Sequence, residues 1–472
     1  MHSKLFKNSI IYTIGNLLPK IASFILVPIY SRYLTPSDYG ITSSMSVLTM
    51  ILAIVFTLAV ERSINRLYYD FKTENERKDF LGTINYAIVI LSSLILLLLF
   101  IFSNLVEKIF SSISFYPYYV YAILAAFLNI LVTVPTMYYR VEEKAKMFVG
   151  LSLIRFAATI VFTLALVVWF KQGAEGYLKA SLLAALFVFP IFLIITLRIT
   201  NFTIKPDILK SSLKFSLPMI PVMVSAWVLN LSDRIFIERY LSLADVGIYS
   251  IGYSAAGFVL LFTGAFYTAY SPHFYKIANS KDKVDAKAEL AKTNNIFIIA
   301  TMAICFVVSL FSKEIIQILF DPRYHQAYIY IPIISLAYFF QQLNGLNHLM
   351  IYQEKKTIVV MYIIIVCATV NVLLNFLLIP LIGAYGAAIT TLLALFSQFT
   401  LSYSVSRRYY FIPFNWKSIL PLLTGAIIVY LLFYYLNLRL IPAMIIKTVL
   451  VAFFVIIFYV KYYHPLKKLV FS

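Results

Sequence analysis

Residues 31–47 read SRYLTPSDYGITSSMSV, and residues 238–254 read ERYLSLADVGIYSIGYS. The two stretches share residues at equivalent positions 207 residues apart, and the shared residues include an Arg, an Asp and a Gly. Hydrophobic segments often resemble one another by chance, but that bias does not place polar residues and glycine in register. The matched pairs are Arg32 with Arg239, Tyr33 with Tyr240, Leu34 with Leu241, Asp38 with Asp245, Gly40 with Gly247, Ile41 with Ile248 and Ser43 with Ser250. We interpret the two stretches as corresponding parts of an internal repeat.

The composition excludes a water-soluble globular protein. Of the 472 residues, 62% are hydrophobic and only 12% are charged, and the mean hydropathy is +0.88. Soluble domains carry about 25% charged residues. Hydrophobic runs recur from one end of the chain to the other, and no polar stretch between them is long enough for a separate soluble domain. The sequence therefore predicts an integral membrane protein.

Fourteen segments are long and apolar enough to cross a bilayer, which takes roughly 20 residues. Backbone groups in lipid must be satisfied within the segment, so continuous segments of this length indicate helices and an all-α fold. The predicted spans are 8–30, 40–60, 82–104, 116–139, 148–169, 176–197, 216–237, 247–271, 294–319, 327–350, 358–379, 384–405, 418–436 and 442–462.

The distribution of Lys and Arg predicts the orientation. The net charge is +19, and most of the 39 Lys and Arg lie in the N-terminal segment, in the loops after even-numbered spans and in the C-terminal tail. The positive-inside rule then places both termini in the cytoplasm. The first residues lead into a span without a small-residue cleavage motif, so a cleavable signal is not expected. The same rule accounts for the excess of Lys and Arg over Asp and Glu, so a nucleic-acid partner is not expected.

A second similarity extends the repeat. Residues 173–186 (GAEGYLKASLLAAL) resemble residues 383–396 (GAYGAAITTLLALF), at an offset of 210. Spans 1–6 and 7–12 thus read as two copies of one six-helix unit, which an axis along the membrane normal would relate. The predicted divisions are 1–205, 206–410 and a 411–472 segment with two added spans and a cytoplasmic tail. In each repeated line we expect the Asp to cap the next helix and the Gly to permit a tight turn.

Two lobes of this kind favour a transporter that works by alternating access over a membrane enzyme. The sequence contains no GxxxxGK[ST] motif for nucleotide phosphates, no HExxH or His/Cys cluster for a metal, and no nucleophile–base arrangement. We expect Cys305 and Cys367, which both lie in apolar runs, to be packing residues. Direct use of ATP, a metal site and catalysis are not expected.

Charged residues within spans are candidates for the substrate path, because a charge at a helix centre costs about 2.5–3.5 kcal/mol on insertion scales. These residues are Lys20, Arg155, Arg234 and Asp233. Each also has a structural interpretation: Lys20 bonded to a nearby carbonyl, Arg155 reaching the cytoplasmic headgroups, and Asp233 and Arg234 compensating each other. Because most of these charges are cationic, a cavity that they line would attract an anion such as a phosphate.

Further candidates lie at the span ends and among the polar residues. Glu61 and Arg62 end span 2, either as an interfacial anchor or where substrate enters. Asn371 and Asn375, at i and i+4 of span 11, either contact substrate or join helices. His348 in span 10 either couples transport to protons or has a structural role. Lys447, near the start of span 14, is expected to reach the headgroups.

The lines DRIFIERYLSLADVGIYSIGY (233–253), PIYSRYLTPSDYGITS (28–43) and GAYGAAITT (383–391) resemble those of the bacterial polysaccharide transporters, the Wzx-type flippases. Their superfamily also holds multidrug exporters of the MATE type and the lipid II flippases. The resemblance covers the whole chain. It implies a V-shaped pair of six-helix lobes, with spans 13 and 14 flanking a groove for a lipid tail. It also implies movement of undecaprenyl-pyrophosphate-linked oligosaccharide between the leaflets.

Cationic cavity residues in this family lie on early helices and on helix 7, where this chain has Lys20, Arg155 and Arg234. Lipid II flippases, however, carry several arginines in their first two helices. Here span 1 has a single lysine and Arg62 ends span 2, which argues against lipid II as the substrate.

The sequence therefore predicts a flippase in the bacterial cytoplasmic (inner) membrane, acting in O-antigen, lipopolysaccharide, capsule or other surface polysaccharide biosynthesis. We expect no cofactor, coupling to a proton or sodium gradient, and membrane lipids, a polysaccharide polymerase and glycosyltransferases as partners. Three other classes remain open: a cation-coupled multidrug exporter, an envelope scaffold without transport and a membrane glycosyltransferase. The short loops argue against the glycosyltransferase, and the lack of acidic residues deep in span 1 argues against the multidrug exporter.

Overall fold

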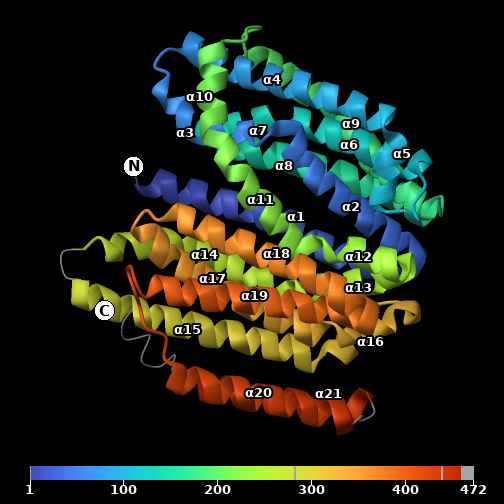
Figure 1. Ribbon diagram of the computed structural model, residues 1–472, viewed down its shortest axis with the longest axis vertical. Helices are drawn as coiled ribbons and strands as arrows, with labels where there is room; N and C mark the ends of the chain where they lie inside the picture. The colour runs from blue at the N-terminus through green and yellow to red at the C-terminus, as the bar shows by residue number, and fades with distance from the viewer. Residues whose placement is uncertain (1, 281–282, 437–439, 459–472) are drawn as a thin grey trace. The chain divides into compact units, whose positions relative to one another are not determined.

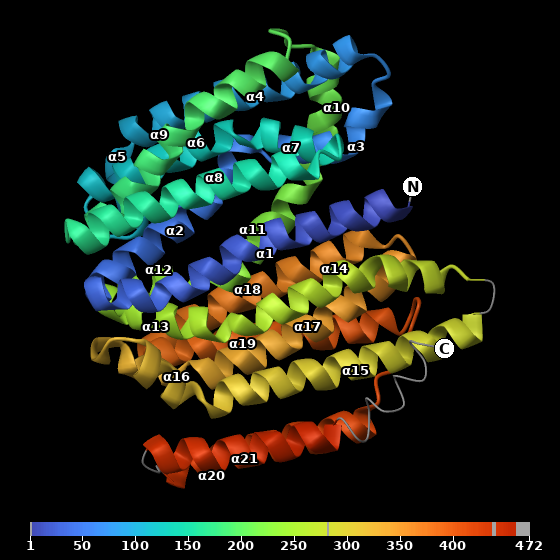
Figure 2. The ribbon, with the colours of Figure 1, turned by 180° about the vertical axis from the view of Figure 1, so that it is seen from behind.

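The computed structural model describes residues 2–280, 283–436 and 440–458, and every regular element in these ranges is a helix (Figures 1 and 2). This confirms the predicted all-α class. The described residues divide into two compact units, which we call unit 1 and unit 2. Unit 1 lies within Met1–Ser250 and Ile364–Ala387, and unit 2 lies within Ile251–Ile363 and Ala388–Ser472. The division at 205 and 410 that the repeat suggests stays a prediction.

Unit 1 is a bundle of long helices. Helix α6 packs on α9 and α2, and α8 packs on α9 and α1. Large side chains such as Phe56, Phe80 and Tyr119 are fully buried in its core. The helices are α1 (His2–Tyr33), α2 (Pro36–Thr57), α3 (Ile64–Leu67), α4 (Glu74–Ile101), α5 (Ser103–Val106), α6 (Val120–Leu131), α7 (Thr133–Val141), α8 (Ala145–Thr163), α9 (Gly173–Ile199), α10 (Pro206–Ser216), α11 (Ile220–Leu231) and α12 (Asp233–Tyr240).

Unit 2 centres on α15, which packs against α14, α17 and α20. Helices α13 (Leu243–Ala256), α18 (Thr357–Ile382) and α19 (Ala384–Ser406) each contribute one end to unit 1 and the other to unit 2. The remaining helices are α14 (Phe258–Ala278), α15 (Lys283–Leu310), α16 (Ser312–Leu319), α17 (Ile331–Gln353), α20 (Trp416–Leu436) and α21 (Leu440–Phe458).

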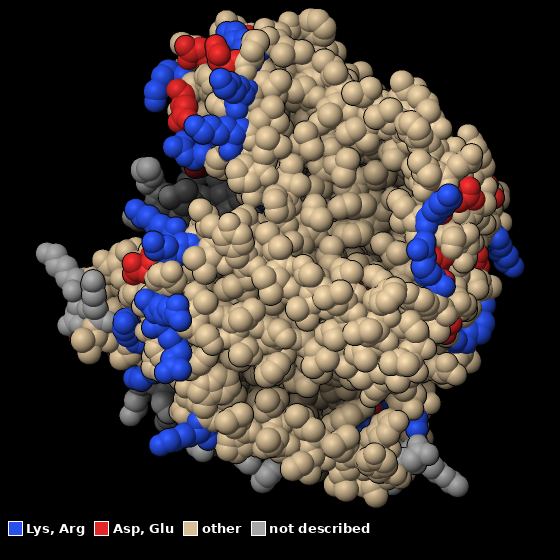
Figure 3. Space-filling view, viewed as in Figure 1, with Lys and Arg blue, Asp and Glu red and all other residues tan. Residues whose placement is uncertain are grey.

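The helices have the length and composition of membrane spans. Among the described residues, ten helices are long and apolar enough to cross a bilayer, or eleven if α13 and α14, which meet at a 40° bend, form one span. On the face drawn in Figure 3, charged side chains gather toward the two ends of the helices and the area between them is mostly uncharged. Each of the fourteen predicted spans overlaps a helix, and the last one extends beyond residue 458, outside the described residues. The count of fourteen stays a prediction.

The two copies of the repeated line each begin a helix, but the side chains that cap these helices are Thr35 and Ser242, three residues before the predicted Asp38 and Asp245. At the start of α2, Thr35 Oγ1 accepts from the backbone N–H of Asp38 at 3.1 Å, and Asp38 accepts from the backbone N–H of Thr35 at 3.0 Å. At the start of α13, Ser242 Oγ accepts from the backbone N–H of Asp245 at 3.1 Å and donates to its carboxylate at 2.5 Å. Both caps satisfy helix N–H groups that would otherwise lack partners.

The matched glycines serve a different purpose from the predicted tight turn. Gly40 and Gly247 lie inside α2 and α13, and a Cβ on Gly40 would overlap the carbonyl oxygen of Leu243. A Cβ on Gly247 would overlap the carbonyl oxygen of Pro36. Pro36 and Leu243 are themselves 207 positions apart, so the contact is reciprocal, as in a two-fold arrangement. The glycines are needed because the two helix backbones touch there.

The contact continues one turn further along both helices. The hydroxyls of Ser43 and Ser250, again 207 residues apart, lie 2.7 Å from each other. The indole N–H of Trp227 on α11 donates to the carbonyl of Val47 on α2 at 3.0 Å. The repeated line is therefore a packing surface within unit 1 as well as a helix start.

We predict that Gly40→Ala and Gly247→Ala each destabilise the protein by roughly 1–3 kcal/mol or more, because the new methyl group meets backbone atoms that cannot rotate away. Gly150→Ala in α8 is the matched control, since a Cβ there has no neighbour within 4 Å. That control should be neutral, or stabilising by up to about 1 kcal/mol through helix propensity. Thermal unfolding of the purified variants measures the difference. Equal stability of all three variants would contradict the close contact.

Candidate functional site

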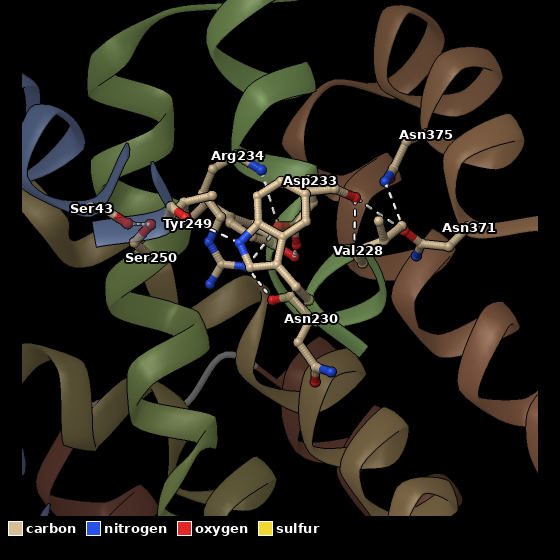
Figure 4. A network of polar contacts seen from close by, with 12 residues as sticks. Ser43, Val228, Asn230, Asp233, Arg234, Tyr249, Ser250, Asn371 and Asn375 are labelled. Atoms are coloured by element: carbon tan, nitrogen blue, oxygen red, sulfur yellow. Dashed lines mark hydrogen bonds and ion pairs between the residues drawn. The ribbon is translucent and has the colours of Figure 1, made fainter. Parts of the chain in front are cut away.

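Asp233 and Arg234 form a buried ion pair in unit 1. They open α12 directly after α11 ends, and their exposed fractions are 2% and 4%. Arg234 Nη1 lies 2.6 Å from Asp233 Oδ1 and donates to the carbonyl of Asn230 at 2.7 Å (Figure 4). Uncompensated burial of either charge would cost several kcal/mol, so each residue requires the other.

Tyr249 of α13 completes the pair. Its hydroxyl donates to Asp233 Oδ2 at 2.5 Å, and the Arg234 guanidinium carbon lies 5.3 Å from the centre of its ring. Both carboxylate oxygens therefore have partners, and the guanidinium also has a favourable position against an aromatic ring. Of the two sequence-based interpretations of this pair, the geometry agrees with mutual compensation. Contact with a substrate remains untested.

The two asparagines of α18 lie beside this pair. Asn371 and Asn375 have exposed fractions of 1% and 0%, and Asn375 Nδ2 donates to Asn371 Oδ1 at 3.2 Å. Ser232, the neighbour of Asp233, donates to the carbonyl of Val228 at 2.8 Å and contacts Asn371 Oδ1 at 3.4 Å (Figure 4). We call Ser232, Asp233, Arg234, Tyr249, Asn371 and Asn375 the buried polar cluster. Four of the predicted site residues meet in it.

Sequence reasoning missed Tyr249 and Ser232. Tyr249 occupies the position that Thr42 holds in the first copy of the repeated line. The hydroxyl of Thr42 donates to the carbonyl of Tyr39 in its own helix. The sequence did contain a clue to Tyr249, because the two copies differ here. Only the second copy carries Asp233 and Arg234 just before its repeated line. Ser232 gave no signal, because isolated serines are common in apolar helices.

Glu61 lies outside the buried polar cluster, in a short 3-10 helix (Val60–Ser63) after α2. Leu58 and Ala59, which precede it, have left-handed backbone with φ of 46° and 57°. Burial raises the pKa of the Glu61 carboxyl, while the nearby Thr57 and Arg62 side chains act in the opposite direction. Glu61 Oε2 is buried without a hydrogen-bond partner among the described residues, and Arg62 Nε lies 3.9 Å from Oε1. The carboxyl thus sits where it could hold a proton.

The other predicted site residues do not join the buried polar cluster within what the structure describes. Arg155 is exposed on α8, and no ion pair to it is found among the described residues. His348 belongs to unit 2, is half-buried, and its Nε2 lies 3.3 Å from Ser402 Oγ. Lys20 lies in α1, and its side chain is outside what the structure describes.

The expectation that Lys447 reaches the headgroups is wrong. Its side chain is buried in unit 2, where Nζ lies 2.7 Å from Glu314 Oε1 and donates to the carbonyl of Leu310 at 2.8 Å. The sequence could not show this pairing, because Glu314 is 133 residues away on α16. Within residues 2–280, 283–436 and 440–458, no three His, Cys, Asp or Glu side chains gather in a way that could hold a metal ion.

The long apolar helices define a multi-pass membrane protein, and comparison with known proteins specifies the family. A model of the family described as polysaccharide biosynthesis protein matches residues 5–278, and a MatE model matches residues 218–377. Protein 1 of the Lsg locus of Haemophilus influenzae is 30% identical over 291 residues, which cover 60% of this chain and 68% of that protein. The chain belongs to the polysaccharide biosynthesis protein family.

Solved structures agree on the fold. The lipid II flippase MurJ in its inward closed conformation has a TM-score of 0.73 at 16% identity, covering 96% of this chain and 99% of its own. The MATE transporter VcmN of Vibrio cholerae in its bent form has a TM-score of 0.56 at 15% identity, covering 86% of this chain and 96% of its own. The chain therefore has the fold of the superfamily that holds polysaccharide exporters, lipid II flippases and MATE transporters, as the resemblance indicated.

We predict that Arg234→Gln destabilises the protein by roughly 3–5 kcal/mol, because it leaves the Asp233 carboxylate buried without a counter-charge. The double variant Asp233→Asn, Arg234→Gln should recover most of this loss. Arg323→Gln is the control: its partner Asp321 lies 2.7 Å away in an exposed pair, which contributes about 0–1 kcal/mol. Thermal unfolding of detergent-solubilised protein gives the comparison. If Arg234→Gln is as stable as Arg323→Gln, the pair does not stabilise unit 1.

Proposed function

We propose that this protein moves undecaprenyl-pyrophosphate-linked oligosaccharides from the inner to the outer leaflet of the bacterial cytoplasmic membrane by alternating access. The observation that carries the proposal is the family match over residues 5–278, on a fold shared with a lipid II flippase along 96% of the chain. The glycan would serve O-antigen, capsule or another surface polysaccharide. A polymerase and glycosyltransferases would supply and use it, and both termini would lie in the cytoplasm.

The charges on the described helices support an anionic substrate. They also indicate which cation would bind its pyrophosphate. Arg234 offers no unpaired positive charge to a substrate, because its Nη1 lies 2.6 Å from Asp233 Oδ1. Arg155 has no such partner among the described residues, although it lies ten residues into the Ala145–Trp169 span. A cation in that place is costly unless it binds an anion, pairs with a carbonyl or reaches the headgroups. Arg155, together with Lys20, is therefore our candidate for the pyrophosphate.

Coupling to a proton or sodium gradient is part of the proposal. Glu61 supports a proton as the coupling ion, because its carboxyl is buried, has a free oxygen among the described residues and has a raised pKa. Such a group binds a proton at one stage of a cycle and releases it when its surroundings change. His348 is the second candidate.

A multidrug exporter is the second candidate function, and the MatE match over residues 218–377 favours it. Export of organic cations calls for an unneutralised carboxylate in the cavity. The buried carboxylate of Asp233 is already paired with Arg234 and Tyr249, which weakens this alternative. A scaffold without transport would need no cation for a substrate, and Arg155 would then have only the structural role of reaching the headgroups.

The test is leaflet transfer in proteoliposomes that contain a short undecaprenyl-pyrophosphate saccharide, under an imposed proton or sodium gradient. We predict transfer by the wild type and a loss of roughly tenfold or more in Arg155→Gln, since a hydrogen bond to a charged group contributes about 1.5–3 kcal/mol. Lys72→Gln, which removes an exposed cation from the loop after α2, should transfer normally. Lys20→Ala should resemble Arg155→Gln.

Equal transfer by Arg155→Gln and the wild type would remove Arg155 from the substrate path. No transfer by folded wild-type protein, together with export of a cationic dye in the same vesicles, would replace the flippase with the multidrug exporter. Neither activity in folded protein would favour the scaffold.

A further inference from the structure

A cavity of about 280 Å³ lies in unit 2, between the end of α15 with α16 and the two last helices α20 and α21. Its wall combines the buried ion pair Lys447–Glu314 with four aromatic residues, Tyr328, Tyr430, Phe433 and Tyr434. Tyr435, 79% exposed, lies at the same wall. The cavity uses residues from outside the six-helix repeat.

Only one of the two carboxylate oxygens of Glu314 has a partner among the described residues. Oε1 pairs with Lys447 at 2.7 Å, whereas Oε2 is buried and has no hydrogen-bond partner among the described residues. The side chains of both residues are more than nine-tenths buried. A buried carboxylate oxygen without a partner is costly, so the site calls for a donor from a ligand or from water.

The wall contains three charged residues: the buried pair Lys447 and Glu314, and the half-buried Lys313. The buried pair favours a neutral ligand. Lys447 and Glu314 neutralise each other, and Lys447 also donates to the carbonyl of Leu310. A phosphate would find no unpaired charge on Lys447, and an amine would have to compete with Lys447 for Glu314. A hydroxyl can donate to Glu314 Oε2 without disturbing the pair.

The aromatic residues fit the same ligand. Tyr430, Tyr434 and Tyr435 lie on one end of α20, with ring centres 6.1 Å apart for Tyr430–Tyr434 and 5.5 Å apart for Tyr434–Tyr435. Tyrosine offers a ring face for apolar C–H groups and a hydroxyl for hydrogen bonds. A pyranose presents one C–H face and a rim of hydroxyls, and a single sugar residue suits a cavity of this size.

We propose that this cavity is a binding subsite for a neutral sugar residue, held by Glu314 Oε2 and the tyrosines of α20. The inference rests on the proposed function, because the sugar would be part of the transported glycan. Under the predicted orientation, the ends of α15 and α20 and the start of α21 face the outer leaflet. The subsite would then receive the glycan on the side to which it is delivered.

The test is saturation-transfer difference NMR on the full chain in lipid nanodiscs, where no sugar-based detergent competes. The probes are glucose, galactose, N-acetylglucosamine, N-acetylgalactosamine, glucuronic acid and glycerophosphoethanolamine. At least one neutral sugar should bind, and glucuronic acid should bind more weakly than glucose, because its carboxylate would lose hydration while Lys447 is already paired with Glu314. Tyr434→Ala should weaken that binding roughly tenfold.

Two further variants separate binding from folding. Tyr362→Ala removes an exposed tyrosine of α18 in unit 2 and should bind like the wild type. The double variant Glu314→Leu, Lys447→Met replaces the pair with apolar groups, so it should fold yet lose the sugar signal.

Three results would overturn the subsite: no signal from any neutral sugar, an unchanged signal in Tyr434→Ala, or binding of glycerophosphoethanolamine alone, which would make the cavity a lipid headgroup site. Leaflet transfer measured on the same preparation keeps the two proposals apart. Transfer without sugar binding rejects the subsite only, and sugar binding without transfer rejects the flippase only.

Discussion

Where α2 and α13 cross, no side chain separates the two backbones. Gly40 meets the carbonyl of Leu243, Gly247 meets the carbonyl of Pro36, and the hydroxyls of Ser43 and Ser250 bond to each other. Any larger residue at either glycine would push the helices apart. The contact places the start of α13 in unit 1, although the same helix continues into unit 2. It also brings Tyr249, two residues beyond Gly247, to the Asp233–Arg234 pair.

The buried polar cluster and the cavity of unit 2 each contain a buried ion pair, and each pair has no net charge. Arg234 is matched by Asp233 in unit 1, and Lys447 is matched by Glu314 in unit 2. Because lipid and packed helices do not solvate single charges, pairing removes most of the cost of keeping these residues. The proposed anionic substrate would therefore have to bind at cations without such a partner, and Arg155 is an example among the described side chains.

The sequence predicted the features that have local or periodic causes. Apolar length indicated the helices, and the 207-residue register indicated that two segments correspond. The Asp residues of the repeated line marked the two helix starts, although the capping side chains are Thr35 and Ser242. The meaning of the matched glycines was missed, because a repeat shows that two segments are equivalent and does not show that they touch. Lys447 was misjudged for a similar reason: its partner Glu314 lies on a distant helix, and only the packing of α21 brings the two together. Asp233, Arg234, Asn371 and Asn375 were each selected, but their convergence required α12 and α18, which are more than 100 residues apart in the sequence, to meet.

The central claim is that the two copies of the repeated line pack against each other, and disulfide cross-linking tests it most directly. Ser43→Cys and Ser250→Cys would be combined in a chain with Cys305→Ala and Cys367→Ala, and oxidised in native membranes. A protease site in the 201–205 loop would allow linked fragments to be seen on a gel. The account predicts efficient linkage, and little linkage when Ser254→Cys, about 6 Å further along α13, replaces Ser250→Cys. Absence of linkage in folded protein, or equal linkage of both pairs, would contradict the account.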